Sequence, residues 1–192
     1  MNPARNVAVL LMMLVGASVV FAQARYKQTM RVTNESTANT GDDSITVNIQ
    51  LAPGWNMVSN PVITANDSVP VLFPTCLGCP VWPPWPIYVD SCRLPHGRGR
   101  WLKCPAGGTV SITGIPIALD SIPVAANWNI IGSLSYPVAA STVTSIPPSI
   151  IRFPFYGFLQ GSGYIRVDTL RPGSSYWVKI TQQGWIVLSA GL

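Results

Sequence analysis

The chain has 192 residues, of which 48% are hydrophobic and only 10% are charged. This composition excludes a largely disordered polypeptide, because such chains are rich in charge and poor in apolar residues. The net charge of +5 is mild, and no recognisable nucleic-acid-binding module accompanies it, so we expect no nucleic acid partner.

The N-terminal segment 1–24 has the pattern of a secretory signal peptide. Arg5 supplies a positive charge, residues 7–21 form an apolar stretch, and Ala22-Gln23-Ala24 is a small-residue cleavage site. The apolar stretch is short for a membrane helix, so we expect no stable membrane span after cleavage. The pattern predicts a secreted, periplasmic or cell-surface protein, in which residues 25–43 form a polar leader or linker.

Alternating apolar and polar residues predict strands along the rest of the chain. Residues 45–51 show the alternation that is typical of a strand with one buried face. Similar segments lie at residues 109–113, 119–124, 164–170 and 185–189, with Gly- and Pro-containing turns between segments. No helical period occurs here, and 18 prolines and 16 glycines argue against long helices. The sequence therefore predicts an all-β fold.

An internal repeat predicts how these strands are organised. The Trp-Asn pair at Trp55 returns at Trp128, and Trp101 returns as Trp177. The second offset is slightly larger than the first, and a short insertion between the repeated segments accounts for the difference. Self-similarity of this kind indicates a duplicated unit, and we predict two tandem, small β-sandwich-like units. The predicted units span residues 44–117 and 118–192.

The repeated residues are predicted to have structural roles. The tryptophans are expected to be core anchors whose indole N–H groups each find one partner. They are Trp55, Trp101, Trp128 and Trp177. Asn56 and Asn129 are expected to bond to backbone groups of the adjacent turns, because Asn side chains readily mimic backbone bonds. Lys103 and Lys179 are expected to point outward from their strands.

All four cysteines lie in one part of the first unit, at Cys76, Cys79, Cys92 and Cys104. Disulfides are the ordinary expectation in an exported chain, and four cysteines allow three pairings. Free thiols and a zinc site are the alternatives, since three of these cysteines and His96 imitate the ligand spacing of a zinc finger. Prolines break the hairpin and helix that such a finger needs. We therefore predict disulfides, and neither a metal nor a cofactor.

Residues 76–100 have only a thin match in the second unit. They hold three of the four cysteines, the single histidine and two tryptophans. A genuine insertion with its own function and a local reading-frame slip in the source sequence would both produce this composition. The run of Arg93, Arg98, Arg100 and Lys103 is expected to be a solvated basic loop.

The best candidates for ligand binding are Trp82, Trp85 and Tyr88, which prolines flank. Flat aromatic faces hold sugars and peptides without needing many charges. The expected partner is a cell-surface protein or a glycan.

Catalysis has few groups available, because the chain has one His and seven acidic residues. Asp90 and Asp168 are the only carboxylate pair worth considering, and solvated strand-edge positions are the expected role for both. Gly161-Ser162-Gly163 lacks the spacing of a nucleophile elbow and indicates a turn. We expect no enzyme.

Two motifs resemble a repeat of secreted, cell-surface proteins of Bacteroidetes-like bacteria. They are Gly54-Trp55-Asn56-Met57-Val58-Ser59-Asn60-Pro61 and Gly173-Ser174-Ser175-Tyr176-Trp177-Val178-Lys179. The family pattern reads G-W-N-L-I-S and G-Y-W-V-K, often precedes type IX secretion sorting domains, and has no established catalytic activity. This chain differs from it at Arg100 and Asn127, where the family has Tyr and Gly.

Together these features predict a non-catalytic exported β-repeat module with a structural or adhesive role at the cell surface. A carbohydrate-binding module that uses exposed aromatics of the first unit is the main alternative, and a small secreted hydrolase is the remaining one.

Overall fold

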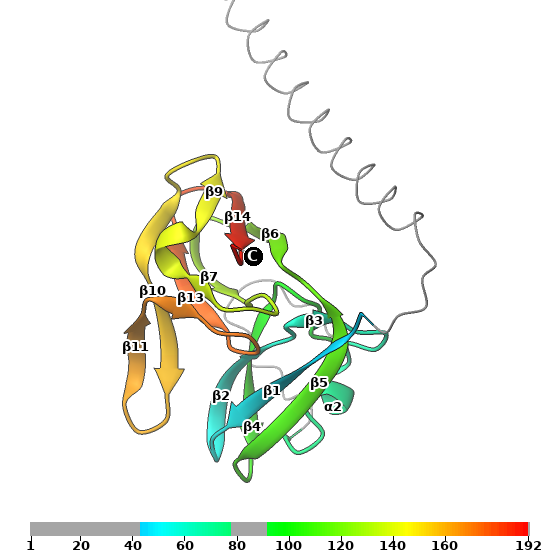
Figure 1. The fold of residues 1–192 in the computed structure, drawn as a ribbon. Helices are drawn as coiled ribbons and strands as arrows, with labels where there is room; N and C mark the ends of the chain where they lie inside the picture. The colour runs from blue at the N-terminus through cyan, green and yellow to red at the C-terminus, as the bar shows by residue number, and fades with distance from the viewer. Residues whose placement is uncertain (1–42, 78–91, 192) are drawn as a thin grey trace, which may run out of the picture. The chain divides into compact units, whose positions relative to one another are not determined.

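The computed structural model describes residues 43–77 and 92–191 (Figure 1). In this part of the chain the only helical segments are the short α2, Val69–Leu72, and the 3-10 turn η1, Ala140–Thr142. Strands account for the rest of the regular structure, and every strand pair is antiparallel. The predicted all-β fold is confirmed. No helix among the described residues has the length and apolar character to cross a membrane.

Residue 117 divides the described strands into two groups, called here the N-terminal half and the C-terminal half. The N-terminal half contains β1 Ile45–Leu51, β2 Gly54–Ser59, β3 Val62–Ile63, β4 Gly99–Cys104 and β5 Gly108–Pro116. The C-terminal half contains β6 Leu119–Val124, β7 Asn127–Ile131, β8 Val138–Ala139, β9 Thr144–Ile146, β10 Ile151–Leu159, β11 Gly163–Val167, β12 Thr169–Leu170, β13 Tyr176–Ile180 and β14 Gly184–Ser189.

These strands form several small sheets. In the N-terminal half the sheet orders are β1-β5-β3 and β2-β4. In the C-terminal half they are β11-β10-β13-β7, β6-β14-β9 and β12-β8. Figure 1 shows β1 and β5 lying side by side and the long β10–β11 hairpin.

Each half has its own hydrophobic core. Alternation along β1 turns Ile49 and Leu51 inward, where they pack with Phe73 and Leu102 among the buried residues of the N-terminal half. The core of the C-terminal half is built in the same way and includes Phe155. All of these side chains except Ile49 and Leu51 are at most 2% exposed, as expected for strands that cover a close-packed interior.

Two strand pairs of the N-terminal half have the same register as two strand pairs of the C-terminal half. β2 and β4 place Trp55 opposite Lys103, and β7 and β13 place Trp128 opposite Lys179. The pairing of β1 with β5 corresponds in the same way to the pairing of β6 with β14. Equivalent partners are therefore separated by the same two offsets as the sequence motifs.

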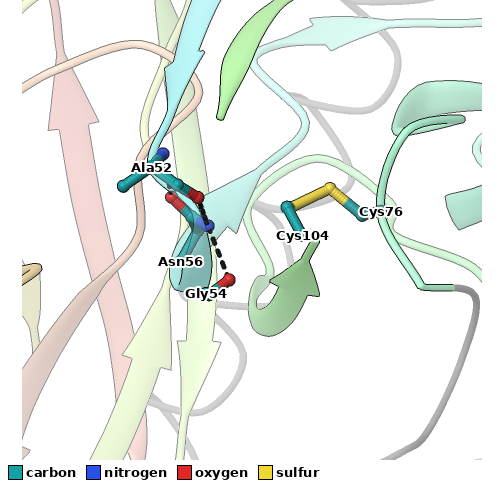
Figure 2. The surroundings of a disulfide bond; sticks show 5 residues. All are labelled: Ala52, Gly54, Asn56, Cys76 and Cys104. Atoms are coloured by element: carbon teal, nitrogen blue, oxygen red, sulfur yellow. Dashed lines mark hydrogen bonds between the residues drawn. A yellow bond between two sulfur atoms is a disulfide. The ribbon is translucent and has the colours of Figure 1, made fainter. Parts of the chain in front are cut away.

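The predicted role of the repeated asparagines is confirmed. Asn56 accepts a bond from Ala52 N at 2.9 Å and donates to Ala52 O at 2.9 Å and Gly54 O at 3.1 Å. Figure 2 shows this side chain bridging the turn that leads into β2. The amide closes the turn because it supplies a donor and an acceptor to backbone groups that the strands leave unpaired.

Asn129 closes the equivalent turn before β7. It accepts from Ala125 N at 3.0 Å and donates to Ala125 O and Asn127 O at 2.8 and 3.0 Å. Asn127 has φ of 85° and its counterpart Gly54 has φ of 96°. This explains how Asn127 can replace a glycine at this position, because Asn tolerates the left-handed region better than most side chains.

Candidate functional site

Five of the residues singled out from the sequence lie outside the described part of the chain. They are Trp82, Trp85, Tyr88, Cys79 and Asp90. The ligand-binding prediction for the three aromatics therefore stays a prediction.

Strand alternation turns the repeated tryptophans away from the two cores. On β4, Leu102 and Cys104 are buried in the core, so Trp101 and Lys103 lie on the opposite side. On β13 the inward residues are Tyr176, Val178 and Ile180, which leaves Trp177 and Lys179 on the outer side. Both lysines are exposed, which confirms their predicted orientation.

The prediction that these tryptophans are core anchors is wrong. Trp55, Trp101 and Trp177 are only partly buried, and Trp128 is 49% exposed. The expected partner for each indole N–H is also missing in one case, because Trp177 Nε1 is buried without a hydrogen-bond partner among the described residues. Recurrence in both halves reflects ring-to-ring contacts on the outer sides of the sheets, which a sequence period cannot distinguish from core packing.

Four rings form one cluster, called here the four-ring cluster: Trp55, Trp101, Phe158 and Tyr164. Trp101 packs edge-to-face against Trp55, Phe158 and Tyr164, with ring centroids 6.4, 4.8 and 6.3 Å apart. Phe158 and Tyr164 lie 5.8 Å apart as cross-strand partners on the β10–β11 hairpin. The cluster joins the halves, because the hairpin belongs to the C-terminal half and both tryptophans to the N-terminal half.

Three further rings form the three-ring cluster: Trp128, Tyr156 and Trp177. Trp128 lies 6.3 Å from Trp177 in an edge-to-face contact and 6.1 Å from Tyr156. Lys179 Nζ lies over the Trp128 ring, 5.9 Å from its centroid. A cation over an indole face is attracted by the ring quadrupole, and the contact holds the ammonium beside an exposed aromatic surface.

Basic side chains accompany both clusters. Cross-strand pairing puts Lys103 beside Trp55, Arg166 beside Tyr156, and Arg152 beside Lys179. These four cations are exposed and make no ion pair with any described residue. Two of the described aspartates, Asp67 and Asp120, are held in ion pairs elsewhere. We call the two ring clusters together with these four cations the aromatic face.

The sequence did not single out Tyr156, Phe158 or Tyr164 as functional residues. At the larger offset of the repeat, Phe158 and Tyr164 are the sequence counterparts of Trp82 and Tyr88. The spacing of Tyr156 and Phe158 was the available signal, since residues two apart on a strand share a face. The turn predicted at residues 161–163 is confirmed, because residues 160–162 form the turn of this hairpin.

The three described cysteines take part in disulfides. Cys76 is joined to Cys104 by a disulfide across a sequence separation of 28 (Figure 2), and Cys92 is also disulfide-bonded. A thiol in a disulfide cannot give the thiolate that zinc needs. The described residues contain no group of three His, Cys, Asp or Glu side chains that would hold a metal ion.

The residues of the predicted basic loop do not form one solvated loop, because Arg100 and Lys103 lie on β4 and Arg93 is ion-paired. Arg93 Nε bonds to Asp67 Oδ1, and His96 Nδ1 lies 3.1 Å from Asp120 Oδ2. The second pair joins the N-terminal half to β6 of the C-terminal half. The hydrogen bond to Asp120 raises the pKa of His96 above its ordinary value of 6.5, with a further contribution from the carboxylate charge and some opposition from burial.

The stability of the protein is expected to fall slightly as the pH rises through the pKa of His96. A raised pKa means that folding favours the protonated ring, so this stabilisation is complete below the unfolded value of 6.5 and is lost above the folded value. The His96 side chain is 43% exposed, so screening limits the effect to about 0.5 kcal/mol. Thermal unfolding at about pH 5.5 and pH 8.5 measures it. Asp120→Asn is the control, and an unchanged pH difference in that variant would contradict the assignment.

The remaining catalytic candidates are not brought together. Asp168 is exposed and accepts a bond from the Thr169 hydroxyl at 3.0 Å. Among the described residues, a shallow, open depression between α2 and β5 is lined only by uncharged side chains, including Asn66, Ser111 and Thr113. Neither place offers the acid, base and nucleophile geometry that a hydrolase requires.

Comparisons with protein-family models, with characterised proteins and with solved structures find no match for this chain.

Proposed function

We propose that residues 44–191 are a non-catalytic exported β-repeat module that has a structural or adhesive role at a cell surface, with the aromatic face as its contact surface. The observation that carries the proposal is the exposure of this face. Trp128 is 49% exposed and Tyr164 58% exposed, and each belongs to a ring cluster rather than standing alone. Clustered exposed aromatic side chains are unusual on a monomeric surface and are typical of interaction sites.

The chemistry of the described side chains supports a binding role over a catalytic one. The single histidine, His96, is ion-paired with Asp120, and Cys76 and Cys104 are joined in a disulfide. The aromatic face itself contains rings and cations but no carboxylate. Rings supply apolar area at low entropic cost, and cations orient a partner without performing chemistry on it.

The direct test is adhesion of the purified mature chain to cells or to a surface coated with cell-envelope material. Trp128→Ala and Tyr164→Ala should each reduce retention about tenfold, which corresponds to about 1.4 kcal/mol. Trp185 is the matched control, because this tryptophan is 37% exposed and lies on β14, outside the aromatic face. Equal losses for Trp128→Ala and Trp185→Ala, or hydrolysis that Asp90→Asn or Asp168→Asn abolishes, would refute the proposal.

Carbohydrate binding is the second candidate, and the pairing of Trp128 with Lys179 favours it. A half-exposed indole offers its face to the C–H groups of a sugar ring, and the ammonium 5.9 Å from the ring centroid supplies a polar contact. Retention on a polysaccharide affinity gel that Trp128→Ala removes and Trp185→Ala preserves would support it. A glycan array without any signal, while adhesion to protein surfaces persists, would remove it.

A further inference from the structure

The backbone contacts between the two halves occur as an exchanged pair. Ser59 N donates to Gly173 O at 2.9 Å, and Gly132 N donates to Gly97 O at 3.0 Å. At the offsets of the repeat, Gly132 is the counterpart of Ser59 and Gly97 is the counterpart of Gly173. The two isolated bridges beside these bonds are exchanged in the same way: Val58 pairs with Ser174, and Ile131 pairs with Arg98.

Side-chain packing repeats the exchange. A side chain at Gly173 would meet Ile49 of the other half, and a side chain at Gly97 would meet Ile122. Ile122 is the counterpart of Ile49 at the smaller offset of the repeat. When every contact between two halves also occurs between the counterparts of the two residues, the interface is isologous and has twofold symmetry. The two halves therefore use the same surface toward each other.

At a twofold axis a residue faces its own counterpart, and two such pairs are present. A Cβ atom on Gly132 would lie 2.9 Å from Cβ of Ser59, its counterpart. A Cβ atom on Gly99 would lie 2.4 Å from Cβ of Ser175, which is again its counterpart. Such distances are too short for two carbon atoms. Each pair therefore has room for one side chain only.

We infer that the two halves associate through one self-complementary surface about a pseudo-twofold axis. At this surface Ser59 faces Gly132 and Gly99 faces Ser175, and these contacts make each half fit the other half better than a second copy of itself. The partner that fits the surface of the N-terminal half is a repeat with Gly where that half has Ser59 and Ser where it has Gly99. The C-terminal half of the same chain meets both requirements with Gly132 and Ser175.

Like halves fit each other poorly for the same reason. Two N-terminal halves would oppose Ser59 to Ser59, where only one Cβ fits, and Gly99 to Gly99, which leaves a void. Overpacking and voids both destabilise a close-packed interface. The Gly and Ser choices therefore favour pairing within one chain over pairing of identical halves from two chains, which is a form of specificity by exclusion.

The hydroxyl of Ser59 contributes a bond that its counterpart does not make. Ser59 Oγ donates to Ser174 O at 2.7 Å and lies 3.4 Å from Ser133 N as an acceptor. The carbonyl equivalent to that of Ser174 belongs to Arg98, and its oxygen would lie 3.0 Å from a Cβ atom at Gly132. Moving the hydroxyl from position 59 to position 132 therefore offers it an equivalent acceptor.

The test is a double-mutant cycle on the full chain with Ser59→Gly, Gly132→Ser and both together. Gly132→Ser should lower the Tm by about 4–8 °C, because it opposes two side chains where one fits. Adding Ser59→Gly should restore at least half of that loss, since one serine again faces one glycine. If Gly132→Ser alone does not fold, recovery of a folded protein in the double variant counts as the expected restoration of stability.

Additive losses, a harmless Gly132→Ser, or a double variant no more stable than Gly132→Ser would each overturn the inference. The control cycle combines Ser59→Gly with Gly161→Ser, because Gly161 has no atom within 4 Å of its added Cβ. Those two changes should be additive, as expected for distant sites. Coupling of the same size in the control cycle would also overturn the inference.

Discussion

Replacing Cys76 and Cys104 together with alanine is expected to lower the free energy of unfolding by about 3–4 kcal/mol, following the loop-entropy relation for disulfides. The bond closes a loop across a sequence separation of 28. Cys104 is fully buried in the core of the N-terminal half. The cross-link therefore removes many conformations from the unfolded chain and ties the segment after α2 to β4.

Equilibrium unfolding in urea, without reductant, measures this loss. The double replacement leaves the disulfide of Cys92 in place, so titration of free thiols in the folded variant should remain at zero. A loss below about 1 kcal/mol would contradict the prediction, because it would mean that the cross-linked loop is already constrained in the unfolded chain.

Gly173→Ala is expected to destabilise the protein by about 2–5 kcal/mol, the sum of a backbone cost and a packing cost. Gly173 has φ of 78°, and a left-handed conformation costs other residues about 1–2 kcal/mol. The added Cβ would lie 2.4 Å from Cγ1 of Ile49, a core residue of the other half, and such overpacking costs about 1–3 kcal/mol. Chemical denaturation of the full chain measures the sum.

Gly97→Ala is the matched control for this change. Gly97 is the counterpart of Gly173 and has a similar φ of 75°. Its added Cβ would lie 3.2 Å from Cγ1 of Ile122 and 3.0 Å from Oδ2 of Asp120, which is less crowded. We therefore expect a loss of about 1–2 kcal/mol, mostly from the backbone. Equal losses in the two variants would show that Ile49 moves aside at little cost.

The two halves differ at Arg100 and its counterpart Tyr176. Tyr176 is buried, and the Tyr176 hydroxyl oxygen accepts a bond from Arg171 N at 2.7 Å. Burial raises the pKa of Tyr176, and the bond from Arg171 opposes that shift in part. Arg100 is half-buried, and desolvation lowers its pKa. The two halves therefore use different chemistry at equivalent places.

The described residues of the unusual segment 76–100 are part of the fold. Leu94 is 1% exposed in the core of the N-terminal half, and Gly97 supplies the carbonyl that accepts from Gly132 N. The earlier part of the segment, residues 78–91, lies outside the described residues.

Sequence by itself determined the fold class, the strand at residues 45–51, the turn near Gly161 and the bonding role of Asn56 and Asn129. These features follow from alternation, turn chemistry and local hydrogen bonding, which act over a few residues. All of this information is local or periodic, so a single sequence contains it.

Only the tertiary structure decided that the repeated tryptophans lie on the outer sides of the sheets and that one cluster of rings crosses between the halves. A period shows that Trp101 and Trp177 are equivalent, but the face they occupy depends on which neighbours on β4 and β13 are buried. Likewise, the opposition of Ser59 to Gly132 arises where two distant segments meet at an axis. Such contacts depend on how the halves dock, and no local pattern specifies them.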